Sequence, residues 1–315
     1  MRALRDCLRR SEAAAPTAMF LALLVVVIGL KGGRYSLFDA ESLATNVLPL
    51  ALVGLGQYFV ILVRGIDLSL GPVMSVSGSI AAVLFPYGVM PALAVAMLGG
   101  LAAGAGNGLL VAWLDMSPVI VTLATMSVWQ GVSLVVLPTP GGVIPPGLQM
   151  ALTNGWLVLP APILLLLLTG LFGAWVMSTR FGLHLRAIGG DAAAAAASGV
   201  AIRRQRFAAY LLAGLLAAFG GLYSAIATSA GSPIIGDGYI LPSIAAVVLG
   251  GVPLIGGRGS PIGVVMGALT LNIIGSLLYF ADLSDFYQSL INGVILVAVV
   301  AAAAVRGWLW RAVAR

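Results

Sequence analysis

Apolar runs of about 20 residues recur along the whole 315-residue chain, and they constrain its fold more than any other feature. A helix of that length matches the thickness of a bilayer's hydrocarbon core. The chain is 61% hydrophobic and only 8% charged, with a mean hydropathy of +1.10, which is not the composition of a soluble domain. Since only helices and closed barrels satisfy their backbone in lipid, we predict an all-α, polytopic transmembrane helical bundle.

The predicted bundle has about ten spans. They cover residues 15–30, 43–63, 72–90, 91–114, 119–137, 158–178, 207–229, 239–256, 260–280 and 286–305. The third and fourth spans are joined only by the Pro86–Pro91 region, so one broken element plus one helix is the alternative there. The basic, then apolar, beginning is also the pattern of a signal peptide, but no small-residue cleavage site follows the apolar run.

The basic residues predict the orientation of the bundle. If the N-terminus is cytoplasmic, all of the 16 Lys and Arg residues except Lys31 and Arg34 fall on the cytoplasmic side. Both termini are then cytoplasmic. Residues 1–14 form a basic N-terminal segment, 15–305 a single transmembrane domain, and 306–315 a basic C-terminal segment. Basic residues that flank apolar spans are orientation signals, so nucleic-acid binding is not expected.

The longest basic loop, residues 179–206, carries five arginines and a run of six alanines. Alanine has the highest helix propensity, Asp191 precedes the run as an N-cap, and Gly199 follows it in a position suited to a left-handed C-terminal residue. The loop therefore predicts a short, smooth-faced helix at the membrane surface, where another protein can contact it.

Two glycine-rich breaks, Arg64–Pro72 and Leu249–Gly259, interrupt the apolar pattern on the predicted cytoplasmic side. They are either tight turns between helices or unwound segments of a transport path. Asp67 has two readings as well. It caps the third span and pairs with Arg64, or it belongs to a gate or a partner contact. The candidate gate residues are Gly65, Asp67, Ser69, Gly71, Gly250, Gly251, Gly256 and Gly257.

Uncharged polar and aromatic side chains also lie within the spans. They are Asn46, Gln57, Tyr58, Asn107, Trp129, Gln130 and Asn272. Amides exchange hydrogen bonds with hydroxyl groups and aromatic faces stack on sugar C–H surfaces, so these residues are candidates for a substrate pathway. The alternative is that they make interhelical hydrogen bonds.

Several kinds of chemistry are excluded. A P-loop needs the GxxxxGK[ST] pattern, and the only lysine, Lys31, does not fit it. His184 has no second histidine or nucleophile arranged around it, and the single cysteine, Cys7, excludes an internal disulfide and a CxxC metal site. No metal site is predicted. No acidic residue lies near the midpoint of a span, which argues against a carrier coupled to protons or sodium.

Seven sequence pieces then match one family in order and spacing. They are Gly65–Gly71; Asn107-Gly108; Pro118–Ala124 with Gly131; Thr179–Gly182; Gly189-Gly-Asp191 with Ala195, Ala196, Ser198, Gly199 and Val200; Gly238-Tyr239; and Ile244–Gly251 with Gly256, Gly257 and Gly259. The chain resembles the membrane permease subunit of bacterial ABC importers for monosaccharides, the ribose, xylose, arabinose and galactofuranose group. It departs from the family at Asp191, where Asn is usual, and at Ile240 and Pro242, where acidic residues are usual.

The resemblance implies an importer in the bacterial cytoplasmic (inner) membrane that moves a pentose or similar monosaccharide inward by alternating access. It implies a second permease chain, identical or a non-identical sister, two cytosolic ATPase domains that bind ATP and Mg, and a periplasmic or lipid-anchored sugar-binding protein. The chain itself is then no enzyme and holds no cofactor. The implied contacts with the ATPase are Gly189, Gly190, Asp191, Ala192, Ala195, Ala196, Ser198, Gly199 and Arg203. An ion-driven secondary carrier and a non-transporting scaffold are the alternatives.

Overall fold

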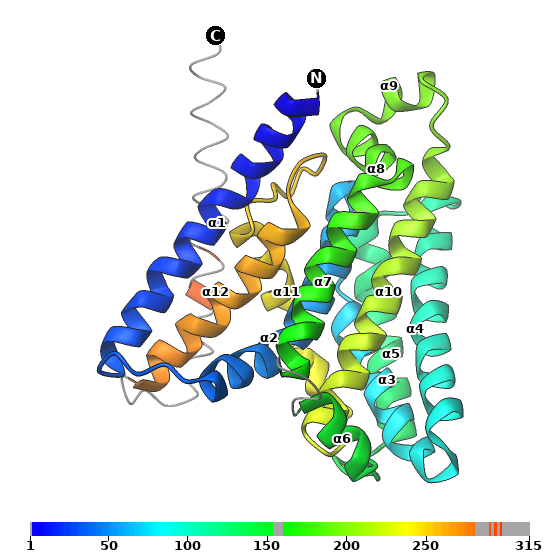
Figure 1. Ribbon diagram of the computed structural model, residues 1–315. Helices are drawn as coiled ribbons and strands as arrows, with labels where there is room; N and C mark the ends of the chain where they lie inside the picture. Colours follow the sequence, from blue (N-terminus) through cyan, green and yellow to red (C-terminus); the bar gives the residue numbers. More distant parts are fainter. Residues whose placement is uncertain (1, 154–159, 281–289, 291–292, 295–296, 298–315) are drawn as a thin grey trace.

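The computed structural model describes residues 2–153, 160–280, 290, 293–294 and 297, with side chains described from Glu12 onward except at 278–280. The described residues form helices and no strand, apart from one isolated bridge between Gly141 and Gly231 (Figure 1). The helices are α1 (Arg2–Leu30), α2 (Leu37–Leu62), α3 (Leu70–Leu84), η1 (Phe85–Tyr87), α4 (Val89–Ala112), α5 (Pro118–Val136), α6 (Pro146–Thr153), α7 (Ala161–Ser178), α8 (Arg180–Gly190), α9 (Ala192–Ala197), α10 (Ile202–Ala227), η2 (Ile235–Tyr239), α11 (Ile240–Leu249) and α12 (Pro261–Phe280). The predicted all-α polytopic class is confirmed.

Seven helices in the described part are long and apolar enough to cross a membrane. They are α1 from Glu12 onward, α2, α3 with η1, α4, α5, α7 and α10. The third and fourth predicted spans are separate helices, because the 3₁₀ turn η1 and Gly88, with φ +132°, separate α3 from α4. The tenth predicted span, 286–305, lies almost wholly outside the described residues.

The eighth predicted span, 239–256, is wrong in length. Helix α11 has only 10 residues and ends at Leu249, where Gly250, Gly251 and Pro253 follow. At 1.5 Å per residue it is about 15 Å long, roughly half of the hydrocarbon core. The residues after it, 250–259, form a loop that returns to the ends of α2 and α8.

Helix α2 begins six residues earlier than predicted. Ser36 and Asp39 form a capping box: the Ser36 hydroxyl accepts from the Asp39 N–H at 3.2 Å, and Asp39 Oδ2 accepts from the Ser36 N–H at 2.8 Å. This reciprocal pair satisfies two free donors of the first turn, so the helix starts before its apolar stretch. The sequence contains this S-x-x-D capping pattern, but the apolar periodicity alone does not reveal the start of the helix.

The core is formed by α2, α3 and α10, which are mostly buried, while less than a third of the spanning stretch of each of α1, α4, α5 and α7 is buried. Helix α10 packs most closely on α4, where Gly100 and Gly104 face Gly214. A Cβ at Gly104 would clash with the backbone of Tyr210. Small residues at spacing four let the two backbones approach, as in other membrane helix pairs.

The two ends of the bundle differ in charge. Helices α8 and α9 lie at one end and α6 at the other (Figure 1). We call the first the basic end, because Arg64, Arg186 and the α8–α10 connection lie there. At the opposite end, which we call the far end, the segment after α5 is fixed by two bonds between Gly141 and Gly231, at 2.8 and 2.9 Å.

Candidate functional site

The alanine helix α9 at the basic end forms as the sequence predicts. Asp191 Oδ1 accepts from the N–H groups of Ala193 (2.8 Å) and Ala194 (3.0 Å), so it caps α9. Gly199 ends the helix with φ +82°. Of the six alanines only Ala195 is buried, so the others present a smooth surface. Ala195 instead packs in the core under α9.

Arg64 fixes the end of α8. Its Nε donates to the Gly189 carbonyl at 2.9 Å and its Nη2 to the Gly190 carbonyl at 2.8 Å. Both carbonyls belong to the last turn of the helix, where a cation also favours the helix dipole. The pairing of Arg64 with Asp67 that we considered from the sequence is therefore wrong, because the long guanidinium reaches α8 instead.

Both glycine-rich breaks, Arg64–Pro72 and Leu249–Gly259, contact the C-terminal end of α8. The Gly257 N–H donates to the Leu62 carbonyl at 3.1 Å, and a side chain at Gly189 would clash with both Leu62 and Gly257. Gly259 is held from two sides, since its carbonyl accepts from the Tyr58 hydroxyl at 3.0 Å and from Arg186 Nη2 at 3.1 Å. We call this meeting point, residues 62–65, 188–190 and 256–259, the junction.

Asp67 lies buried two residues beyond the junction, in the turn between α2 and α3. Its Oδ1 accepts from the Ser69 N–H (2.9 Å) and the Ser69 hydroxyl (2.7 Å). Asn107 on α4 donates to the Asp67 carboxylate at 3.3 Å and to Ser69 Oγ at 2.8 Å. Thr125 on α5 donates to Asn107 Oδ1 at 2.7 Å. The buried carboxylate thus accepts from two residues, Ser69 and Asn107, and Thr125 on α5 fixes the Asn107 amide.

Gln57 completes this network from α2. With its amide oriented to satisfy both partners, it donates to the Asp67 carbonyl at 2.9 Å and accepts from the Asp67 N–H at 3.2 Å. Gln57, Asn107 and Tyr58 were candidates for a substrate pathway, and all three are buried with protein partners. Gln57 and Tyr58 bond loop backbone, and Asn107 joins α4 to the α2–α3 turn. A role for them in a substrate pathway stays a prediction. Gln130 similarly donates to the Pro233 carbonyl at 3.1 Å, and Trp129 packs on the core around α3 and α10.

A cavity of about 700 Å³ opens between α1, α2, η2–α11 and α12 toward the far end. Asp39, Ser42 and Asn46 line it from α2, at the three- and four-residue spacing of one helical face. Asn272 and Ser276 line it from α12. Asn46 and Asn272 are thus the two pathway candidates that the structure brings to one cavity, and no amide hydrogen bond of either is seen in the described part.

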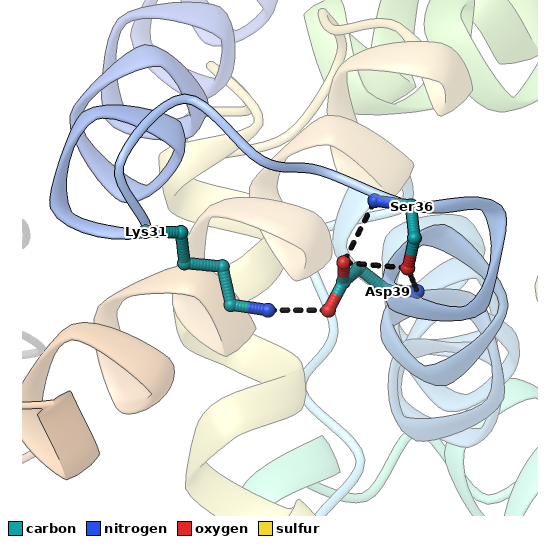
Figure 2. Close-up of polar contacts among 3 residues, drawn as sticks. All are labelled: Lys31, Ser36 and Asp39. Atoms are coloured by element: carbon teal, nitrogen blue, oxygen red, sulfur yellow. Dashed lines mark hydrogen bonds and ion pairs between the residues drawn. The ribbon is translucent and has the colours of Figure 1, made fainter.

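Lys31 and Asp39 form an ion pair at this cavity, joining the end of α1 to the start of α2 (Figure 2). Figure 2 shows Asp39 using one carboxylate oxygen for Lys31 and the other for Ser36, so the same residue caps α2 and ties it to α1. Asp237 lies across the cavity, and burial raises the pKa of its carboxyl above the ordinary value. Neutral amides, hydroxyls and paired charges suit a neutral, hydroxyl-rich solute.

A family model described as the permease component of the branched-chain amino acid transport system matches residues 40–300. The chain belongs to this permease family. The permease is 35% identical to a ribose import permease of Bacillus subtilis over 89% of this chain and 90% of the relative. It is 31% identical to a D-allose transport system permease of Escherichia coli (90% of each chain). It is 33% identical to an autoinducer 2 import system permease of Klebsiella pneumoniae (94% and 87%). No solved structure matches it.

Sequence reasoning on this permease missed three features. Helix α8 was not predicted, although its buried Gly182, Leu185 and Ile188 follow the three-residue spacing of a helical face. The Arg64 contact with α8 joins residues 125 and 126 positions apart, and no local pattern shows such a contact. The Lys31–Asp39 pair was missed because the span was started too late, at residue 43.

Proposed function

We propose that this permease is the membrane-spanning subunit of an ATP-driven importer that moves a monosaccharide into the bacterial cytoplasm. The observation that carries the proposal is its similarity, over about nine tenths of both chains, to permeases named for ribose and allose. The third relative is named for autoinducer 2, so this compound belongs in the substrate panel beside the two sugars.

The far-end cavity is the entry point in this proposal. Its volume of about 700 Å³ lies within the range of small-molecule sites, roughly 300–1,000 Å³. Asn46 and Asn272 present amides that both donate to and accept from sugar hydroxyls. The resemblance of the chain to sugar importers supports a separate binding protein that delivers the solute, so this cavity does not need high affinity.

ATP hydrolysis drives transport from the basic end of the bundle. Two cytosolic ATPase domains bind ATP and Mg, and the exposed alanines of α9 form the surface on which they dock. The proposal is supported by the rigid anchoring of this segment, because Arg64 and the junction connect α8 directly to α2. A movement of α9 then displaces the helices that line the pathway. A second permease chain completes the path.

Transport into proteoliposomes tests the proposal. The permease is reconstituted with its ATPase and its binding protein, and uptake of labelled ribose, allose and autoinducer 2 is measured with ATP or a non-hydrolysable analogue inside. We expect uptake of a monosaccharide that requires ATP hydrolysis. Uptake by the permease alone under a proton or sodium gradient would instead establish the secondary carrier, and no flux under either condition would establish the scaffold.

A further inference from the structure

A second cavity, distinct from the far-end cavity, lies on the side of the bundle near the basic end. It is a cleft of about 600 Å³ between α1, α7 and the start of α12. Its walls are mostly small or apolar side chains, among them Ala14, Ala18, Leu21 and Ile262. Leu21 and Ile262 are 51% and 42% exposed, so the cleft opens outward among apolar residues. Its walls therefore suit an acyl chain.

One charged side chain, Arg186, lines this cleft. Its Nη2 is used by the Gly259 carbonyl, while its Nε is buried and has no hydrogen-bond partner in the described part of the chain. The guanidinium therefore keeps hydrogen-bonding capacity beyond its bond to the Gly259 carbonyl. Glu12, on α1 beside the cleft-lining Ala13, makes no ion pair with Arg186 among the described residues.

We propose that this cleft binds a glycerophospholipid of the cytoplasmic leaflet, with its phosphate on Arg186 and one acyl chain along α1. A phosphodiester in the cleft would accept from the Arg186 guanidinium, and guanidinium groups bind phosphate strongly. Basic pockets between transmembrane helices on the cytoplasmic side are suited to lipid headgroups. The lipid holds α1 against α7, which the described part leaves separated by the cleft.

Binding of phosphatidylglycerol to the delipidated full-length chain tests this inference, with native mass spectrometry as the readout. The control probe is diacylglycerol with the same acyl chains, which fills the cleft but has no phosphate. We expect phosphatidylglycerol to bind about tenfold more tightly, because one charge-assisted hydrogen bond distinguishes the two lipids. Equal binding of the two probes would overturn the assignment to Arg186.

Two variants test the contribution of the headgroup contact and that of the acyl-chain cleft separately. R186Q removes the guanidinium charge that binds the phosphate, and its matched control is R180Q, which changes an exposed arginine of the same helix. A18W fills the cleft and leaves Arg186 intact, and its control is A22W, an exposed position of α1 outside the cleft. We expect R186Q and A18W to lose about tenfold in affinity for phosphatidylglycerol while both controls keep it. Unchanged affinity in A18W, whose Arg186 contacts are preserved, would place the lipid elsewhere.

Discussion

Asp67 is a buried residue on which several polar contacts inside this permease converge. Its carboxylate accepts from Ser69 and Asn107, and Thr125 fixes the Asn107 amide so that its NH₂ group faces Asp67. In D67N an amide NH₂ would replace one acceptor and face these donors. We expect the variant to lose about 1–3 kcal/mol of stability, the cost of leaving buried donors unpaired.

The matched control for D67N is D115N. Asp115 is exposed, and its only described ion pair, with Arg206 at 3.7 Å, lies at the surface. Surface pairs contribute about 0–1 kcal/mol, so D115N should leave the apparent unfolding temperature in detergent nearly unchanged. Equal melting of the two variants would show that the buried network contributes no more than a surface charge.

Arg64 makes a contact that a lysine cannot reproduce. Its planar guanidinium reaches two successive carbonyls of α8 from separate nitrogens, whereas an ammonium group is a single point of charge. In R64K we expect faster amide hydrogen exchange over residues 187–200, because the end of α8 and the start of α9 lose their anchor. R203K, at an exposed arginine of α10, is the control and should leave the exchange pattern unchanged.

At the scale of elements, the closest packing is that of α4 on α10. In G104L the new side chain meets the Tyr210 backbone, which cannot move aside, and overpacking of this kind costs about 1–3 kcal/mol or more. Gly106, two residues along the same helix, has open space beyond its Cα. G106L should therefore fold and melt like the wild type, and the difference between the two variants in a thermal melt measures the helix contact alone.

The elements also show which parts of the structure the sequence could predict. Most transmembrane helices lie near their predicted ranges, and α9 forms between its predicted cap and glycine, because these features depend on local periodicity and capping. The length of α11 was mispredicted because an apolar run continues past Leu249, although Gly250 and Gly251 end the helix. Arg64 bonds α8, Asn107 bonds the α2–α3 turn and α5, and Gln57 bonds the turn after its own helix. No local pattern shows these partners, so the roles of the three residues needed tertiary structure.

At the scale of the whole molecule, polar side chains fall into two groups that transport measurements can separate. Gln57 and Asn107 hold the basic half of the bundle together, whereas Asn46 and Asn272 line the far-end cavity. We expect N46A and N272A to raise the KM for uptake about fivefold each, since each loses roughly 1 kcal/mol of hydrogen bonding to the sugar. Their thermal stability should stay that of the wild type.

The matched comparison is Q57A, which removes both bonds to the Asp67 backbone. It should lower the apparent unfolding temperature, because two buried backbone groups lose their partners. The KM of the protein that remains folded should change little, since Gln57 does not line the cavity. If N46A and N272A lowered stability and left KM unchanged, the far-end cavity would be a gap in the packing, and the sugar would have to enter along another surface of the permease.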